Sequence, residues 1–421
     1  MIAHDYSEGV FDLIAALLFL CAAFGYVSHK YLRLPNTIGL VVISLAVSLC
    51  ILAMEIAMPQ WAVPQTAREL LTRFPFSQAL MVGALSFLLF AGALTVDLSM
   101  LLKNKGTVFL LAIGGVLVAT FLFGSGMWLI FGWLGVPISF SYCIVLGAIL
   151  SPTDPVAVID VLKRIGLSNR MSTIIAGESL FNDGVAVVIF SIALGVAASA
   201  GPVDLSAAHL MGEFFKEAGG GIVLGLLTGG VAFLALRSID HHIVEVLITM
   251  ATAAVTYAVG LWLEISGPIA VVVAGLIVGN PGRKLAMSEH VDQHVTVFWT
   301  LIDEILNAGL FLLIGFEVLA IAWKAQVMVA ALLAIPLALI ARYLSLIPPL
   351  ALVGLRKQEP GTLRILTWGG LHGGISVALV LALPDSPVRE AFLTVCYAVV
   401  VFSIVVQGLT LERVAAAVRK D

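Results

Sequence analysis

The sequence has 421 residues, of which 61% are hydrophobic and only 11% are charged, and its formal net charge is −4. Soluble domains carry about 25% charged residues, so this composition, with a mean hydropathy of +1.10, excludes a soluble globular protein. Long apolar stretches recur along the whole chain and predict an all-α polytopic membrane protein. We expect the lipid bilayer, and no nucleic acid, as its main partner.

Thirteen apolar segments are long enough to cross a bilayer as helices, whereas the strands of a membrane barrel need only about 10 residues and alternate in polarity. The segments are 10–29, 36–57, 77–101, 106–134, 139–163, 170–198, 212–236, 242–264, 266–281, 295–321, 325–352, 362–383 and 388–411. The N-terminal stretch carries Asp5 and Glu8 and no basic region, so we expect the first segment to be retained rather than cleaved.

The positions of Lys and Arg indicate the orientation of these segments. With thirteen spans and a cytoplasmic C-terminus, 16 of the 22 basic residues fall on the inside, 5 on the outside and Arg342 within the membrane. We therefore expect a multi-pass protein of the cell (inner) membrane with a periplasmic or extracellular N-terminus. The connecting loops are short, and we expect residues 1–421 to form a single transmembrane unit without a soluble regulatory domain.

Two segments are interrupted by residues that break a helix. Pro152 and Pro155 flank Asp154 in the fifth segment, and proline removes a backbone donor. The twelfth segment contains the glycine-rich stretch GGLHGG at 369–374. Paired interrupted helices in corresponding halves of a chain point to a transporter's binding site near the membrane midplane. Segments 4–6 and 11–13 are therefore candidates for inverted repeats, although glycine pairs also occur in ordinary packed membrane helices.

The sixth segment carries a group of polar residues in the sequence AGESLFNDGVAVVIF. Ser179 and Asp183 are four residues apart and lie one above the other on a helix face. Asp154 supplies a second carboxylate, and the broken helix frees carbonyls such as that of Thr153. Carboxylate, hydroxyl and carbonyl oxygens suit a small hard cation. A structural ion pair is the alternative for an isolated acid, and the clustering of these residues favours a binding site.

Arg342 is the only arginine that falls clearly in the middle of a segment. An unpaired arginine at that depth costs at least several kcal/mol, so it needs an acidic partner, and we expect Glu178 to be that partner in a structural ion pair. Asp303 and Glu304, beside Asn307, lie inside the tenth segment. They are explained equally well by a cytoplasmic funnel and by plain solvation.

The stretches SPTDPVAVIDVLKRIG, GESLFNDGVAVVIF, RYLS at 342–345 and WGGLHGGISVALVLALP at 368–384 resemble the monovalent cation/proton antiporters of the NhaP and eukaryotic Na⁺/H⁺ exchanger type. The resemblance covers the whole chain. It implies an NhaA-like antiporter fold in which the two interrupted helices cross. It also implies a homodimer, with a core domain at about 106–198 and 325–411 and a dimerisation domain at about 10–101 and 212–321.

The same resemblance implies roles for individual residues. Asp183 is the principal carrier of cation and proton, and Asp154, Ser179 and the Thr153 carbonyl complete a Na⁺ site. Asn182 is the fifth residue of this cation- and proton-binding set. It occupies the position that is aspartate in electrogenic relatives, which predicts electroneutral exchange of one Na⁺ (or Li⁺) for one H⁺. Glu178 and Arg342 match the ion pair of the family's core.

Two positions depart from the family pattern. Ala91 stands where relatives often have glutamate in the third segment, and His372 stands where an arginine is usual. Histidine titrates near neutrality, so His372 is a candidate modulator of pH dependence, although a tolerated substitution explains it as well.

The sequence thus predicts a secondary active transporter that serves cation and pH homeostasis, rather than an enzyme, and that needs no cofactor. A K⁺/H⁺ antiporter of the same fold remains an alternative. An intramembrane hydrolase is a weak alternative from another class, because no Gly-x-Ser-x-Gly elbow surrounds Ser179.

Overall fold

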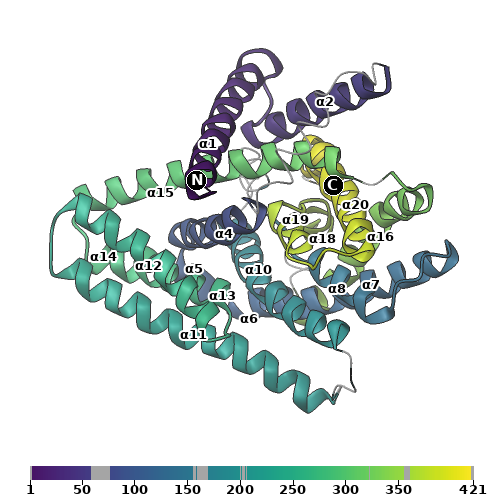
Figure 1. The fold of residues 1–421 in the computed structure, drawn as a ribbon. Coiled ribbons are helices and arrows are strands. Elements are labelled where there is room, and N and C mark those ends of the chain that lie inside the picture. Colours follow the sequence, from purple (N-terminus) through teal and green to yellow (C-terminus); the bar gives the residue numbers. More distant parts are fainter. Residues whose placement is uncertain are drawn as a thin grey trace.

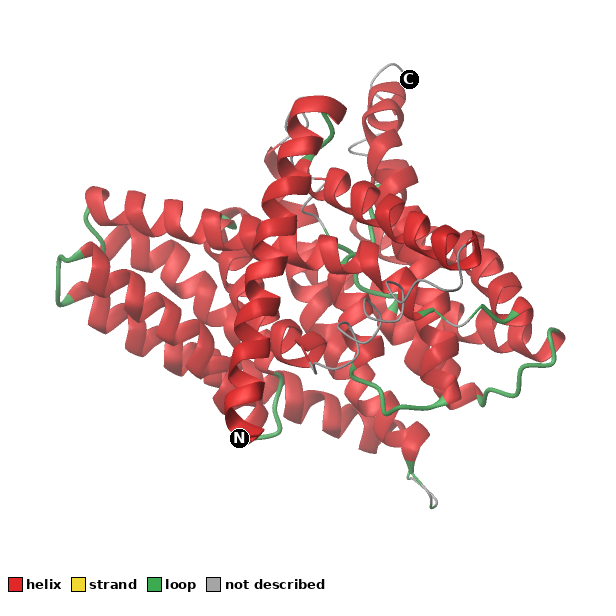
Figure 2. Cartoon of the chain, turned by 45° about the horizontal axis from the view of Figure 1, so that its top comes forward, coloured by secondary structure: helices red, strands yellow, loops and turns green. Residues whose placement is uncertain are grey.

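The computed structural model describes residues 2–57, 76–154, 158, 169–199, 201, 204, 206–321, 323–354 and 361–418. Regular structure in these residues is helical (Figure 2). The α-helices are α1 (Ile2–Val27), α2 (Asn36–Ala57), α4 (Phe76–Thr95), α5 (Leu98–Lys103), α6 (Lys105–Phe109), α7 (Val116–Trp133), α8 (Phe140–Ile149), α10 (Asn169–Ala198), α11 (Ala207–Arg237), α12 (His242–Trp262), α13 (Gly267–Ile277), α14 (Arg283–Leu285), α15 (Glu289–Phe316), α16 (Ala325–Val353), α18 (Thr362–Trp368), α19 (Gly374–Leu381), α20 (Pro387–Phe402) and α21 (Gly408–Val418).

Nine helical stretches in the described part of the chain are long and apolar enough to cross a membrane. They are 14–32, 36–55, 105–133, 170–198, 207–237, 242–262, 289–319, 325–353 and 387–417. Every one of the thirteen predicted segments overlaps a helix. The total number of crossings stays a prediction, because the other segments contain shorter helices such as α8 and α19.

The helices gather in two groups (Figure 1). On the left of that view, α11, α12 and α13 pack side by side, and α4 packs on α13 and on α15. On the right, α7 packs on α8 and α16, and α20 packs on α16 and α19. Helix α10 lies between them and contacts both α8 and α13. This division places α10 where two packed groups meet.

A stripe of small residues holds the left-hand group together. Gly221, Gly225 and Gly229 recur every four residues on α11 and face α13. A Cβ atom at Gly225 would overlap the carbonyl of Ala270, and one at Gly229 would lie 2.9 Å from Cα of Ala274. Small residues at this spacing let two membrane helices approach closely, which gains van der Waals contact where lipid offers no hydrophobic driving force.

Two non-helical stretches, 151–154 and 369–373, meet in the right-hand group and are called the breaks. Helix α8 ends at Ile149, and the chain from Ser151 to Asp154 is not helical. Helix α18 ends at Trp368 and α19 begins at Gly374. The two irregular stretches are joined where the N–H of Asp154 donates to the carbonyl of Leu371 at 2.6 Å. The first break thus supplies the donor and the second break the acceptor of this hydrogen bond. Such pairing is needed because apolar surroundings offer no water to backbone groups outside a helix.

The start of α5 is set by a capping residue. Asp97 follows α4 and is the N-cap of α5, where its side chain accepts hydrogen bonds from the N–H groups of Ser99 and Met100. Its position between two helices agrees with the interfacial location expected for a charged residue near a span end. The hydrogen bonds from the Ser99 hydroxyl and the Met100 N–H lower the pKa of Asp97 below its ordinary value.

Candidate functional site

The four polar residues of the ESLFND stretch of α10 form two adjacent columns on the helix surface. Glu178 and Asn182 are four residues apart, and so are Ser179 and Asp183. Residues at this spacing lie one above the other on a helix. All four are buried, with exposed fractions between 0% and 8%. The two columns have different surroundings, so their residues have different chemical roles.

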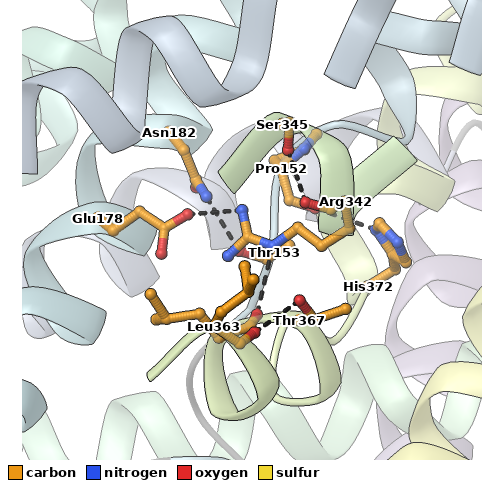
Figure 3. A network of polar contacts seen from close by, with 10 residues as sticks. Pro152, Thr153, Glu178, Asn182, Arg342, Ser345, Leu363, Thr367 and His372 are labelled. Atoms are coloured by element: carbon orange, nitrogen blue, oxygen red, sulfur yellow. Dashed lines mark hydrogen bonds and ion pairs between the residues drawn. The ribbon is translucent and has the colours of Figure 1, made fainter. Parts of the chain in front are cut away.

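The first column contacts α16 through an ion pair (Figure 3). Nη1 of Arg342 lies 2.6 Å from Oε1 of Glu178, and the two side chains are 7% and 2% exposed. Nε of Arg342 also donates to the carbonyl of Leu366 at 3.4 Å. A buried charge of either sign needs such a partner. The contact expected from the sequence is present.

One turn further along the same column, Asn182 reaches the broken stretch after α8. Its Nδ2 donates to Oγ1 of Thr153 at 3.0 Å (Figure 3). Its Oδ1 is fully buried and has no hydrogen-bond partner among the residues that the structure describes. The first column therefore ties α10 to the break and leaves one amide oxygen available as an acceptor.

His372 connects the two breaks. Nδ1 of its ring lies 3.1 Å from the carbonyl of Pro152 (Figure 3), and its backbone N–H donates to Oγ of Ser403 at 2.9 Å. Because a carbonyl only accepts, Nδ1 carries the proton in this contact. The ring is 6% exposed. Pro155, the second predicted helix breaker, lies outside the described residues.

The second column faces a cavity of about 350 Å³. Ser179, Asp183 and Asp154 line this cavity, whereas Thr153 and Asn182 do not. The structure thus brings three of the five predicted cation-binding residues to one space and places the other two behind it. Asp183 is 8% exposed, and no hydrogen bond or ion pair reaches its carboxylate from the described residues.

A glycine of the second break packs closely against the side chain of Asp154. A Cβ atom on Gly373 would lie 2.8 Å from Cβ of Asp154 and would overlap its carboxylate. Gly370 packs in the same way beside Nε of Arg342, where a Cβ would lie 2.7 Å away. These glycines are needed for close approach, a reason for the GGLHGG stretch that the sequence alone did not give.

Helices α4 and α15 form another part of the cavity wall. Ala91 and Gly92 on α4 present no polar side chain to the cavity, whereas Asp303, Glu304 and Asn307 on α15 line it. The sequence left these α15 residues undecided between a funnel and plain solvation. The available signal was the spacing of Asp303 and Asn307, which puts both on one face of an apolar helix.

Arg283 is the only basic residue among those lining the cavity, and it is already paired. Its guanidinium forms a two-pronged contact with Asp292, in which Nη2 lies 2.9 Å from Oδ2. A planar guanidinium matches a carboxylate in this geometry. The pairing largely neutralises the arginine and leaves the carboxylates to set the sign of the cavity's potential.

The arrangement suits a small monovalent cation or a proton. Carboxylate and hydroxyl oxygens are hard ligands, which bind hard cations in preference to soft metals. The described residues contain no group of three or more His, Cys, Asp or Glu side chains arranged to hold a metal ion. Buried carboxylates without a positive partner are costly unless a cation or proton neutralises them. A ligand that binds and leaves fits this chemistry better than a resident metal.

A bundle of long apolar helices around a carboxylate-lined cavity, beside paired breaks in two of them, defines a multi-pass membrane transporter. The sodium/hydrogen exchanger transmembrane model matches residues 15–417. The chain belongs to this family, which is a family of transporters.

Individual relatives and solved structures agree. The chain is 44% identical over 406 residues to the Na⁺/H⁺ antiporter NhaP of Pseudomonas aeruginosa, with 95% of each chain covered. It is 33% identical over 412 residues to the Na⁺/H⁺ antiporter NhaG of Bacillus atrophaeus, covering 96% of this chain and 74% of the other. The structure of the sodium proton antiporter MjNhaP1 from Methanocaldococcus jannaschii superposes with a TM-score of 0.75 at 19% identity, covering 99% and 100% of the two chains. This likeness identifies the fold.

Proposed function

We infer that the protein is a secondary active transporter that exchanges Na⁺ for H⁺ across the cell membrane. The observation that carries this inference is Asp183, a buried carboxylate that receives no hydrogen bond or ion pair from the described residues and faces a cavity also lined by Asp154 and Ser179. Membership of the sodium/hydrogen exchanger family and similarity to named Na⁺/H⁺ antiporters support the same reading.

The coupling follows from one set of oxygens serving two ligands. Na⁺ and H⁺ both neutralise Asp183, so they compete for it, with Asp154, Ser179 and the Thr153 carbonyl as further ligands to the cation. Either loaded form crosses the low-dielectric barrier at modest cost. The empty, charged form does not, because a bare carboxylate inside a membrane costs several kcal/mol. Exchange is therefore favoured over leak.

Movement between the two sides is assigned to the two helix groups. The core domain comprises residues 106–198 and 325–411, and the dimerisation domain comprises residues 10–101 and 212–321. The cavity is lined by residues of both sets, among them Asp183 of the first and Asp303 of the second. A core that moves against the other domain would expose the site alternately, and two dimerisation domains would pair in a homodimer. In this proposal, the breaks near Asp154 and Leu371 mark the point where two interrupted helices of an inverted repeat cross. The unit has thirteen membrane-spanning helices, and its N-terminus lies on the outer side of the membrane.

Asn182 sets the predicted stoichiometry at one proton per cation. A second carboxylate at this position would add a charge to the cycle, whereas an amide adds none. Net charge movement would couple turnover to voltage by about 2.3 kcal/mol per 100 mV for each charge. We expect turnover in proteoliposomes to be unchanged when a K⁺/valinomycin potential is imposed. A clear acceleration or slowing would contradict the 1:1 ratio.

His372 is a candidate modulator of pH dependence. Its Nδ1–H bond to Pro152 joins the two breaks, and its burial near Arg342 opposes a second positive charge. Protonation would therefore disturb the crossing rather than add a stable cation. A His372→Arg variant with an activity–pH profile identical to that of the wild type would refute this role.

The central test measures Na⁺-dependent dissipation of a pH gradient in everted membrane vesicles. We expect the wild type to respond to Na⁺ and Li⁺ and the Asp183→Asn variant to be inactive while it elutes as a folded protein in detergent. Running K⁺ in parallel tests the alternative of a K⁺/H⁺ antiporter. A fully active Asp183→Asn variant would refute the proposed mechanism.

A further inference from the structure

The α15 wall of the cavity carries polar chemistry that the proposed mechanism does not use. Asp303 is half-buried there, and Nδ2 of Asn307 donates to its Oδ1 at 3.2 Å. This bond orients the carboxylate and uses one of the two N–H donors of the Asn307 amide, whose oxygen is an acceptor. Asn307 itself is 5% exposed. A carboxylate and an amide oxygen held side by side are the ligand types that hard cations bind.

The charges around the cavity favour a cation at this position. Four carboxylates line the cavity, those of Asp154 and Asp183 and, from α15, those of Asp303 and Glu304. The single arginine of the lining is committed to Asp292, which lies outside it. A cleft lined by one sign of charge with low-dielectric walls concentrates ions of the opposite sign. Asp183, more than nine-tenths buried and without a hydrogen bond or ion pair from the described residues, independently marks the same space as one that receives a cation.

We propose that Asp303, supported by Asn307 and Glu304, forms a second, outer cation-binding site on α15, from which Na⁺ is passed to the Asp154–Asp183 pair. The inference rests on the proposed Na⁺/H⁺ exchange. The outer site belongs to the dimerisation domain and the inner pair to the core, so they share one cavity only when the core faces this side. The effect of Asp303 on cation binding is therefore restricted to one face of the membrane.

The face can be assigned from the ends of the helices that line the cavity. Thr95 at the end of α4 and Arg283 at the start of α14 both line it. The positive-inside distribution assigns both ends to the cytoplasm. The outer site consequently raises the apparent affinity for cytoplasmic Na⁺ and leaves that for external Na⁺ unchanged.

The test compares the apparent KM for Na⁺ on the two faces, in everted and right-side-out vesicles made from the same cells. We expect Asp303→Asn to raise the KM about tenfold in everted vesicles. This is the effect expected from removing one negative charge close to a bound cation in a cavity that contains some water. The KM in right-side-out vesicles stays within twofold of the wild type. The Asp303→Glu variant, which keeps the charge, stays within about threefold on both faces.

Glu289→Gln is the matched control, because Glu289 is an exposed acid on the same helix and does not line the cavity. Its KM is expected to be unchanged on both faces. Asn307→Ala supplies a second, independent variant that releases the Asp303 carboxylate, and it raises the KM on the cytoplasmic face alone.

An unchanged KM in both the Asp303→Asn and the Asn307→Ala variants, or an equal rise on both faces, overturns the outer site. The proposed function still holds in that case if the wild type exchanges Na⁺ for H⁺ and the Asp183→Asn variant is inactive. A wild type without Na⁺-dependent proton movement would overturn both.

Discussion

The ion pair between Glu178 and Arg342 allows the sharpest prediction about stability. Surface ion pairs contribute about 0–1 kcal/mol, but these side chains are 2% and 7% exposed and approach to 2.6 Å. Removing one partner leaves the other charged and out of water. The remaining contact of the guanidinium, to the carbonyl of Leu366 at 3.4 Å, is too long to compensate. We therefore expect Glu178→Met or Arg342→Met to lower the free energy of unfolding by about 3–5 kcal/mol.

The double variant Glu178→Met/Arg342→Met should behave differently. Replacing a whole buried ion pair by apolar residues of similar size is often neutral or stabilising, so we expect it to be more stable than either single variant. The measurement is unfolding of the purified protein in detergent by a graded addition of SDS, followed by tryptophan fluorescence. Single variants within about 1 kcal/mol of the wild type, or a double variant whose loss equals the sum of both, would refute the reasoning.

Three further predictions concern the surroundings of the site. Gly373→Ala should displace the Asp154 carboxylate and raise the KM for Na⁺ with little loss of folded protein; an unchanged KM would show that the side chain has room. Asp292→Asn should free the charge of Arg283 at the cavity and slow Na⁺ uptake from that side at low ionic strength, an effect that salt should reduce; stopped-flow measurements in which the rate is unaffected would contradict this. Because the pKa of Asp97 is lowered in the folded protein, its cap on α5 stabilises above the ordinary aspartate pKa of about 3.9 and is lost as the pH falls through the folded value. Hydrogen exchange of the first turn of α5 should accelerate there, and the Asp97→Ala variant should show no such step.

Much of the fold could be predicted because the bilayer imposes strong constraints on sequence. Runs of apolar residues must be helices that satisfy their own backbone, and all thirteen predicted segments overlap helices. The Glu178–Arg342 contact followed from the cost of a lone arginine in lipid. These predictions needed no knowledge of which helix packs against which.

Predictions that depend on packing between distant segments were less complete. Ser179, Asn182 and Asp183 of α10 were assigned to one ligand set, whereas the helix places Asn182 in the column of Glu178, and only Ser179 and Asp183 line the cavity. The α15 wall could not be assigned, since helical periodicity identifies a polar face but not the space it borders. The contact of Gly373 with Asp154 was likewise unforeseen, because it joins breaks that are far apart in the chain.

The hydrogen bond between Asp154 N–H and the Leu371 carbonyl is carried by main-chain atoms alone. Every amino acid except proline offers the same two groups, so mutations at these positions can alter the side chains without dissolving the junction. Evolution can consequently change which ion is accepted, and how tightly, while inheriting the architecture that presents it. Swapping side chains around this junction is for the same reason a practical route to engineering variants with altered ion preference.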